Sequence, residues 1–499
     1  MTAPIETELK LDLDEDAGPA IRNYLVASFG RHAEKHRLVS TYFDTLDKHL
    51  WHAGVTLRVR QDGERYIQTI KVENSEAAGL FSRPEWERGI SGVSPNLDEP
   101  TGNLLTKLTG GPVPAKALAA LFTTDIERTL WHAECDGAVL EVSNDEGAIS
   151  SDGRILPVHE LEMELKRGPN AALFQLAARI GAAVPIRIAV QSKAERGHVL
   201  GGRGDGEARR AEPILLNDHM TVAKGFQAIG HACLRHYRLN EALFLESPHP
   251  ELLHQCRVAL RRLRSALVLF KTLLDDPESM KLGHRLRESA RSFGDGRNID
   301  VLIGRLNNAP LVVKKLALQR EQIYAELLVE LRSLEFRALI LDLTAWINTG
   351  AWLSESDTED ERTGPIDRYA LHMLRRCRRR LKRRGKHLSR LDAVHQHGVR
   401  ISAKKLRYAA EFFCNLFPGR GALSHQKQFL QAVESLQTEL GHLTDQATGA
   451  ELLERFAIGA SLLDRALVSD KGRSTDAAAQ AFETLMDLKP FWARRSRLA

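Results

Sequence analysis

The stretch Ile5-Glu6-Thr7-Glu8-Leu9-Lys10-Leu11 alternates charged and apolar side chains with a period of two. Successive side chains of a β-strand point to opposite faces, so Glu6, Glu8 and Lys10 share one face and the apolar set shares the other. The same alternation returns in VTLRVR, TIKV, EWE and ELEMEL, at residues 55–60, 69–72, 85–87 and 160–165. These segments predict a sheet in which strand after strand has a charged face.

The rest of the first 200 residues predicts how these strands are arranged. We expect eight strands, at 5–13, 37–43, 54–61, 65–73, 84–90, 125–133, 138–149 and 154–166. The two candidate helices, near 17–29 and 170–182, are separated by nearly all of the strands, which excludes a βαβ alternation with a parallel sheet. The first half therefore predicts an α+β domain built on a closed antiparallel barrel of eight strands.

The charges on the predicted strands segregate by strand. Carboxylates occupy the first and last strands, and cations occupy the central ones. A single charged face is usually a solvated face, but repetition on every strand favours a charged interior. A dry interior of this kind would be very costly, because buried charges lose their hydration. A wet lumen that binds a metal–triphosphate complex would use both signs, cations for phosphate oxygens and carboxylates for a hard metal ion.

The charged positions form an ordered series along the chain: Glu6-x-Glu8-x-Lys10, Arg58-x-Arg60, Lys71, Arg128, Asp145, Glu160-x-Glu162 and Ser192-Lys193. This series resembles the signature of the CYTH domain, the triphosphate tunnel metalloenzymes, over about residues 1 to 200. The segments RPEWERGI, LFTTDIERTLW and HELEMELKRG further resemble the bacterial inorganic triphosphatases of that family. The resemblance implies an eight-stranded antiparallel tunnel, a Mg²⁺ or Mn²⁺ requirement, and hydrolysis of triphosphate to pyrophosphate and phosphate.

The resemblance also implies a role for each matching residue. The expected metal ligands are Glu6, Glu8, Asp145, Glu160 and Glu162. The residues expected to bind phosphate for catalysis are Lys10, Arg58, Arg60, Lys71, Arg128 and Lys193. Glu164 shares the face of Glu162 but lies nearer the strand end, so we expect it outside the first ligands of the metal. The roles of Glu85 and Glu87 stay open.

The second half contains an internal repeat with helical spacing. HQCRVALRRLRSALVLF (254–270) and HGVRISAKKLRYAAEFF (397–413) agree in register. Their basic residues recur at spacings of three, four and three, which places four on one face of each helix: His254, Arg257, Arg261 and Arg264, and His397, Arg400, Lys404 and Arg407. Each row is about 15 Å long, from a rise of 1.5 Å per residue. Such duplicated rows favour an extended polyanion, and the near absence of aromatic or amide groups among them argues against nucleic acid.

These helices resemble the CHAD domain, a helical module that often follows a CYTH domain and binds inorganic polyphosphate. RESARSFGDGRNIDVL and LQTELGHLTDQA are similar to paired helix ends of that domain, although Asn298 stands where the family commonly has an acidic residue. The resemblance implies two antiparallel helical bundles around a basic cavity, without catalytic activity. We expect a CYTH domain at 1–200, a Gly-rich linker at 201–212 and a CHAD domain at 213–499.

Composition narrows the remaining possibilities. The 499 residues are 43% hydrophobic and 27% charged, and no apolar run approaches the roughly 20 residues that span a bilayer. The first residues lack the pattern of a secretion signal, so we expect a cytoplasmic protein without a membrane partner. Five dispersed cysteines without a CxxC pair argue against a disulfide framework and a structural zinc site. Residues 375–386 carry nine basic residues in twelve, which could extend the cavity or, as we expect, lie on the surface.

The function predicted from the sequence is a metal-dependent inorganic triphosphatase joined to a polyphosphate-binding module. The expected partners are inorganic triphosphate and long-chain polyphosphate, and the oligomeric state stays open. Two alternatives remain at this point. One is a hydrolase or cyclase of an organic triphosphate such as thiamine triphosphate or ATP. The other is a scaffold that binds polyphosphate without turnover.

Overall fold

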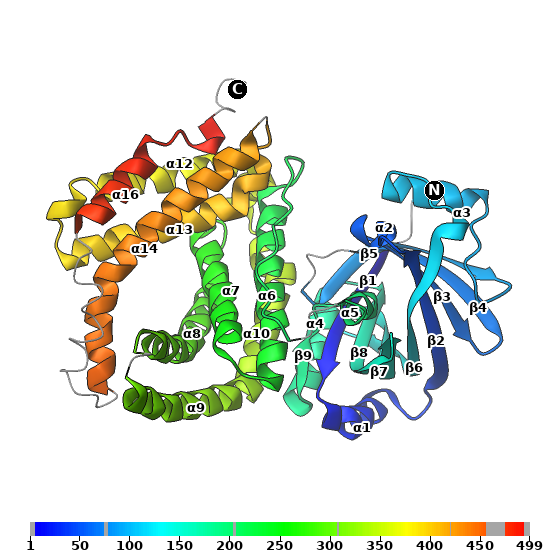
Figure 1. Cartoon of the computed structure of the whole chain (residues 1–499). Helices are drawn as coiled ribbons and strands as arrows, with labels where there is room; N and C mark the ends of the chain where they lie inside the picture. The colour runs from blue at the N-terminus through cyan, green and yellow to red at the C-terminus, as the bar shows by residue number, and fades with distance from the viewer. Residues whose placement is uncertain are drawn as a thin grey trace. The chain divides into compact units, whose positions relative to one another are not determined.

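The computed structural model describes residues 5–73, 78–202, 206–306, 309–419, 421–455 and 475–493, and the side chains of 442–455 lie outside this description. The chain forms two compact units (Figure 1). The first combines Met1–Ala208 with Leu331–Gly350, and the second combines Arg209–Glu330 with Ala351–Ala499.

The first unit is built on a closed antiparallel barrel of eight strands. Around the barrel the strands follow the order β5-β4-β3-β2-β6-β7-β8-β1, and β1 pairs with β5 to close it. Their bounds are β1 (Ile5–Leu13), β2 (Glu34–Thr45), β3 (Val55–Asp62), β4 (Arg65–Val72), β5 (Leu80–Ile90), β6 (Leu118–Cys135), β7 (Ala138–Ser151) and β8 (Arg154–Arg167). The predicted eight-stranded barrel is confirmed.

The closure depends on strand β5. Its first half, from Leu80 to Pro84, pairs with β1, and its second half pairs with β4. The sequence pattern predicts this strand from residue 84, where a proline cannot donate to a sheet ladder. Strand β5 therefore begins four residues earlier than expected, and this additional stretch joins the two edges of the sheet.

Apolar side chains on the outer faces of the strands pack under helices. Helices α1 (Gly18–Phe29) and α4 (Ala171–Ala183) match the predicted pair. The structure adds α2 (His49–His52), α3 (Glu99–Thr109), α5 (Lys193–Leu200) and a short strand β9 (Ile186–Ile188) that pairs with β1. One apolar core joins α2 and α3 to β3 and β4, and another places α5 against β2, β6, β7 and β8. The first core lies on the outside of the barrel. The strand residues of the second share the inward face of Arg58, Arg128 and Glu160, so with α5 they fill one end of the interior and leave the rest for charged side chains.

The second unit is helical, as predicted. Its helices are α6 (Val222–Glu246), α7 (Pro250–Leu269), α8 (Pro277–Arg305), α9 (Pro310–Arg332), α11 (Glu359–Thr363), α12 (Ile366–Arg384), α13 (Ala393–Phe413), α14 (Ala422–Arg455) and α16 (Thr475–Asp487). The sequence repeat is a repeat in structure, since α6, α7 and α8 pack in succession, as do α12, α13 and α14. The two repeated segments lie on α7 and α13, which contact one another.

One helix groups with the barrel although it lies far along the chain. Helix α10 (Leu334–Thr349) packs on α4 and β9 and belongs to the first compact unit. The predicted division at residues 200 and 213 places this helix in the second half. The sequence of an apolar helix reveals its periodicity but not which surface it packs against. The division into residues 1–200, 201–212 and 213–499 stays a prediction.

Candidate active site

The interior of the barrel holds a cavity of about 530 Å³ lined almost entirely by charged side chains. Its cations are Lys10, Arg58, Arg60, Lys71, Arg83, Arg128, Lys166 and Lys193. Its carboxylates are Glu6, Glu8, Glu73, Glu85, Glu87, Glu141, Glu162 and Glu164. The two signs balance at eight each, so cations alone could not neutralise a triphosphate in this lumen. A ligand of that charge would need to bring metal cations with it.

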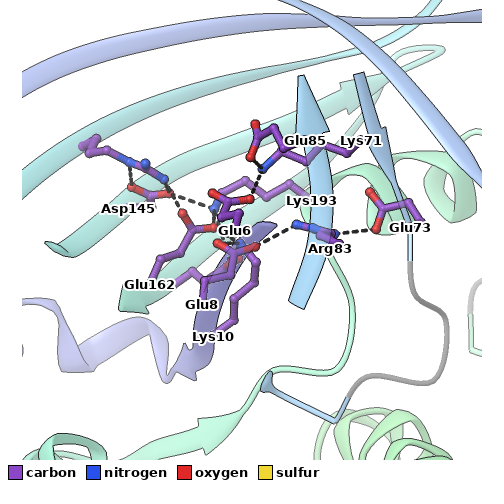
Figure 2. A network of polar contacts seen from close by, with 12 residues as sticks. Glu6, Glu8, Lys10, Lys71, Glu73, Arg83, Glu85, Asp145, Glu162 and Lys193 are labelled. Carbon is purple, nitrogen blue, oxygen red and sulfur yellow. Dashed lines mark hydrogen bonds and ion pairs between the residues drawn. The ribbon is translucent and has the colours of Figure 1, made fainter. Parts of the chain in front are cut away.

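Glu162 on β8 is the centre of the ion-pair network. It accepts hydrogen bonds from Lys10, Arg128 and Lys193, the last at 2.8 Å. Burial opposes its charge, but the three cations hold its pKa well below the ordinary value. Figure 2 shows the side chains of Glu162, Lys10 and Lys193 pointing toward one another from different elements. Glu162 is therefore ionised at neutral pH, and it fixes the position of three cations that phosphate could share.

Two of the predicted metal ligands, Asp145 and Glu160, are fully buried. Asp145 is 0% exposed, accepts two hydrogen bonds from Arg128 at 2.7 and 2.6 Å, and lies 2.7 Å from Lys193 Nζ. Glu160 is also 0% exposed, and burial raises its pKa. Neither residue lines the cavity, whereas the other nine residues predicted for the tunnel do. Asp145 orients Arg128 and Lys193 from behind the wall.

The opposite wall pairs lysine and glutamate from β1, β4 and β5. Lys71 Nζ lies 2.6 Å from Glu6 and 2.8 Å from Glu85, while Lys10 Nζ lies 3.0 Å from Glu8. Glu85, whose role the sequence left open, thus faces the lumen. Figure 2 shows Glu85 and Glu6 on either side of the Lys71 ammonium group.

Arg60 is the cation with the weakest compensation. Burial and then its neighbours Arg58 and Arg128 lower the pKa of Arg60 to about 10. Its Nε donates to Ser40 Oγ at 3.3 Å, and the carboxylates nearest Arg58 lie 3.7 and 3.8 Å away. Arg60 therefore lies beside two other guanidinium groups with less negative charge than it needs, which is the environment of an anion-binding site.

The lumen residues form a chemically suitable donor set for a hard divalent ion. Glu160 Oε1 is buried and accepts no hydrogen bond within the described part of the chain, although Lys193 Nζ lies 3.3 Å away. No three His, Cys, Asp or Glu side chains among the described residues lie close enough to hold a metal by themselves. Because Mg²⁺ commonly binds through one or two carboxylates plus substrate phosphates and water, the set fits an ion held by a few carboxylates and completed by water or phosphate.

Sequence reasoning missed three residues of this network. Arg83 lies in the first half of β5, before Pro84, and Glu73 follows the last residue of β4, so both fall outside the alternating segments that selected the others. Arg196 lies on α5, one turn after Lys193, and donates to Glu160. The spacing of Lys193 and Arg196 on a short helix was the available signal. Glu164, expected outside the centre, pairs with Lys166 at 2.6 Å and lines the cavity away from Glu162.

In the helical unit, the basic rows of α7 and α13 come together. Burial, Arg261 and Arg297 lower the pKa of Arg257, and Arg400 adds to the effect. This places cations from α7, α8 and α13 in one electrostatic cluster. Arg261 Nε donates to Tyr408 Oη on α13, and its guanidinium carbon lies 5.7 Å from the centroid of the Tyr408 ring.

The rows also include cations that the repeat did not indicate. Arg287 and Arg297 on α8 each depress the pKa of a neighbour on α7, Arg264 and Arg257 respectively, in addition to burial. The repeat is less symmetric at its histidines, since His254 is half-buried whereas His397 is exposed. Burial, followed by Arg297, lowers the pKa of His254, so this side chain is neutral within the cluster.

Comparison with known families agrees with the family resemblance of both halves. The CYTH domain model matches residues 4–197, and the CHAD domain model matches residues 228–454. The chain contains a CYTH domain followed by a CHAD domain. The inorganic triphosphatase of Haemophilus influenzae is 31% identical to the CYTH half over 199 residues, which are 40% of this chain and 55% of the relative. The chain thus matches about half the length of that curated relative.

Solved structures resemble each domain separately. The CHAD domain of the plant Ricinus communis covers 56% of this chain and 96% of its own length, at 26% identity and a TM-score of 0.47. An adenylyl cyclase candidate from Hippeastrum, described as having a dominant triphosphatase activity, covers 39% of this chain and 95% of its own length, at 20% identity and a TM-score of 0.33.

The basic run at 375–386 of the CHAD domain lies on α12, and its members differ in surroundings. Arg375 and Arg379 are exposed, as expected for a surface run. Arg378 instead donates to the carbonyl oxygens of Met486 and Leu488 at the end of α16, at 2.7 and 3.1 Å.

No described helix of the chain combines the length and apolarity needed to cross a membrane.

Proposed function

We propose that the chain is a metal-dependent inorganic triphosphatase that hydrolyses tripolyphosphate to pyrophosphate and phosphate. The observation that carries this proposal is the convergence of Arg58, Arg60 and Arg128 inside a closed barrel, with Arg60 only weakly compensated by the carboxylates around it. The identity with an inorganic triphosphatase over the CYTH domain supports it.

The residues of the lumen have different roles in the reaction. The three arginines bind phosphate oxygens, and Arg60 gains an anionic partner that the lumen carboxylates do not fully supply. Lys10 and Lys193, held together by Glu162, lie where they can contact the phosphate as well as the carboxylate. Their charges stabilise the negative charge that the departing pyrophosphate acquires when water attacks the terminal phosphorus in line.

The metal proposed for this site is Mg²⁺ or Mn²⁺. Glu6, Glu8 and Glu162 of the lining would hold it, together with Glu160, whose Oε1 lies just beneath the lining, 3.3 Å from Lys193 Nζ. Asp145 contributes by positioning Arg128 and Lys193. When bound, the ion would neutralise phosphate charge and orient the attacking water. No covalent nucleophile is needed, because water attack cleaves one phosphoanhydride bond directly.

The lining of the cavity favours an inorganic substrate. Tyr42 is the one aromatic residue among the described side chains that line it, and this ring is buried against Phe122, with ring centroids 4.5 Å apart. A purine or thiamine group would gain from an aromatic surface at the mouth, and the lining offers none. A phosphate-release assay with Mg²⁺ tests the proposal by comparing tripolyphosphate, thiamine triphosphate, ATP and long-chain polyphosphate. Preference for an organic triphosphate, or no turnover of any of them, would contradict it.

We also propose that the CHAD domain binds long-chain polyphosphate without hydrolysing it. The cluster of cations from α7, α8 and α13 supports this, because burial and then mutual repulsion lower the pKa of Arg257, and an extended polyanion would relieve the repulsion. Binding that weakens steeply with salt would agree with the proposal, since a polyanion releases counterions when it binds. Tighter binding of duplex DNA than of polyphosphate would contradict it.

A further inference from the structure

Two arginines outside the predicted series each hold one glutamate of the barrel interior, Arg83 from within the cavity lining and Arg196 from helix α5. On β5, Arg83 Nη2 donates to Glu8 Oε1 at 2.7 Å, and its Nη1 donates to Glu73 Oε2 at 2.6 Å. On α5, Arg196 Nη2 donates to Glu160 Oε2. Figure 2 shows Arg83 stretched between Glu8 and Glu73.

In both glutamates the arginine donates to one carboxylate oxygen, and the other oxygen lies on the side of the lumen lysines. Glu8 Oε2 lies 3.0 Å from Lys10 Nζ. Glu160 Oε1 lies 3.3 Å from Lys193 Nζ and accepts no hydrogen bond within the described residues. The arginines therefore fix the plane of each carboxylate and determine which oxygen is presented to a ligand.

Both arginines are themselves rigidly held. Arg83 is 3% exposed, and its guanidinium carbon lies 5.1 Å from the centroid of the Phe81 ring. Helix α5, which carries Arg196, packs closely on β6, since a Cβ atom at Gly197 would lie 2.2 Å from the Phe122 ring. A planar guanidinium can connect two carboxylates in a defined geometry, whereas a lysine ammonium at the same place acts as a point charge.

We propose that Arg83 and Arg196 are positioning residues that orient Glu8 and Glu160 toward the metal of the triphosphate site. This inference rests on the proposed function and names the residues that position two of its metal ligands. Partners that hold a metal ligand from behind fix its orientation, and their loss typically weakens metal binding roughly 10–100-fold. Neither arginine needs to contact the substrate for this role.

Lysine substitutions separate orientation from charge. Arg83→Lys and Arg196→Lys keep one positive charge behind each glutamate, so the electric field at the site changes little while the fixed carboxylate plane is lost. We expect calorimetric titration of the full-length variants with Mn²⁺ to show roughly 10–100-fold weaker binding. The concentration of Mn²⁺ that gives half-maximal phosphate release should rise in parallel, while thermal melting reports whether each variant is folded.

A matched control is available on the outside of the barrel. Arg37 on β2 donates from Nε and Nη2 to the two oxygens of Asp125 on β6, at 3.1 and 2.8 Å, and is exposed. Arg37→Lys makes the same chemical change in a bidentate pair away from the lumen. Its Mn²⁺ affinity should equal that of the unmodified protein.

If Arg83→Lys does not fold, Glu73→Gln takes its place, because it leaves Glu8 and Arg83 intact and weakens only the far anchor. We expect roughly fivefold weaker Mn²⁺ binding, as for the loss of one hydrogen bond. Glu164→Gln, which removes the same charge from the same lining, controls for the change in field. Arg196→Lys tests the second position independently.

The outcomes distinguish this inference from the proposed function. Folded lysine variants that bind Mn²⁺ within about twofold of the unmodified protein would overturn the positioning role. Equal losses of affinity in Glu73→Gln and Glu164→Gln would overturn it as well. An unmodified protein that binds Mn²⁺ but releases no phosphate would contradict the proposed function alone, whereas one that binds no Mn²⁺ would overturn the inference together with the metal assignment.

Discussion

Replacing Glu162 with glutamine would remove the one charge that three lumen cations share. Because Lys10, Lys193 and Arg128 hold its pKa well below the ordinary value against the effect of burial, the ionised carboxylate stabilises the fold above its unfolded-state pKa. That contribution is lost as the pH falls through the folded-state pKa. At neutral pH the substitution should therefore destabilise the barrel as well as abolish turnover.

The size of the loss follows from the contacts that remain. Breaking a buried ion pair by removing one partner costs about 3–5 kcal/mol. Lys10 keeps Glu8 at 3.0 Å, and Lys193 and Arg128 keep Asp145 at 2.7 and 2.6 Å, so we expect the lower end, about 3 kcal/mol. Urea denaturation in a phosphate-free buffer measures the change. The freed cations should retain binding of tripolyphosphate without metal while phosphate release falls to background.

Glu164 provides the matched control on the same strand and face. It is half-exposed and pairs with Lys166 at 2.6 Å, and such solvated pairs contribute about 0–1 kcal/mol. Glu164→Gln should therefore keep its stability and its turnover. Equal losses of stability in the two variants, or near-normal turnover of Glu162→Gln in Mg²⁺, would refute the central role of Glu162.

Three further predictions test other parts of the chain. Arg60→Ala should lower kcat/KM for tripolyphosphate roughly 10- to 100-fold, as expected for loss of a charge-assisted contact of about 1.5–3 kcal/mol. The substitution should cost little stability, because it also removes the repulsion between Arg60 and its neighbouring arginines. Unchanged kinetics would exclude phosphate binding by Arg60. Burial lowers the pKa of His198 to about 4, so below the ordinary histidine pKa the unfolded state binds more protons than the folded state. The free energy of unfolding should therefore fall by about 2 kcal/mol between pH 7 and pH 5. Urea denaturation of His198→Leu should show a smaller fall, and an equal fall would contradict the role of His198. Arg257→Glu should weaken polyphosphate binding and flatten its salt dependence far more than Arg379→Glu on the exposed face of α12, as measured by salt titration; equal losses would make the paired rows ordinary basic surface.

The barrel was predictable because its strands repeat a strong local signal. In Ile5–Leu11 the period of two specifies both faces, and a shift of one residue would exchange the charged and apolar sets. The helical half was predictable for the same reason at a period of three to four. The short helices α2, α3 and α5 were not predicted, since each is stabilised by packing on a strand and by capping. Asp44, for example, accepts hydrogen bonds from the first backbone amides of α2, those of Leu50 and Trp51, both at 2.9 Å.

The sequence by itself determined which residue types face the lumen, because side-chain direction in a strand follows from position along the chain. Only the tertiary structure decided which carboxylate meets which cation, since the contacts of Glu162 come from β1, β6 and α5, which are far apart in sequence. It also decided that Asp145 and Glu160 lie just beneath the cavity lining and that Arg83 and Arg196 hold Glu8 and Glu160. Closure of the sheet between β1 and β5 is the physical reason, because it brings the first strand and the end of the domain around one enclosed volume.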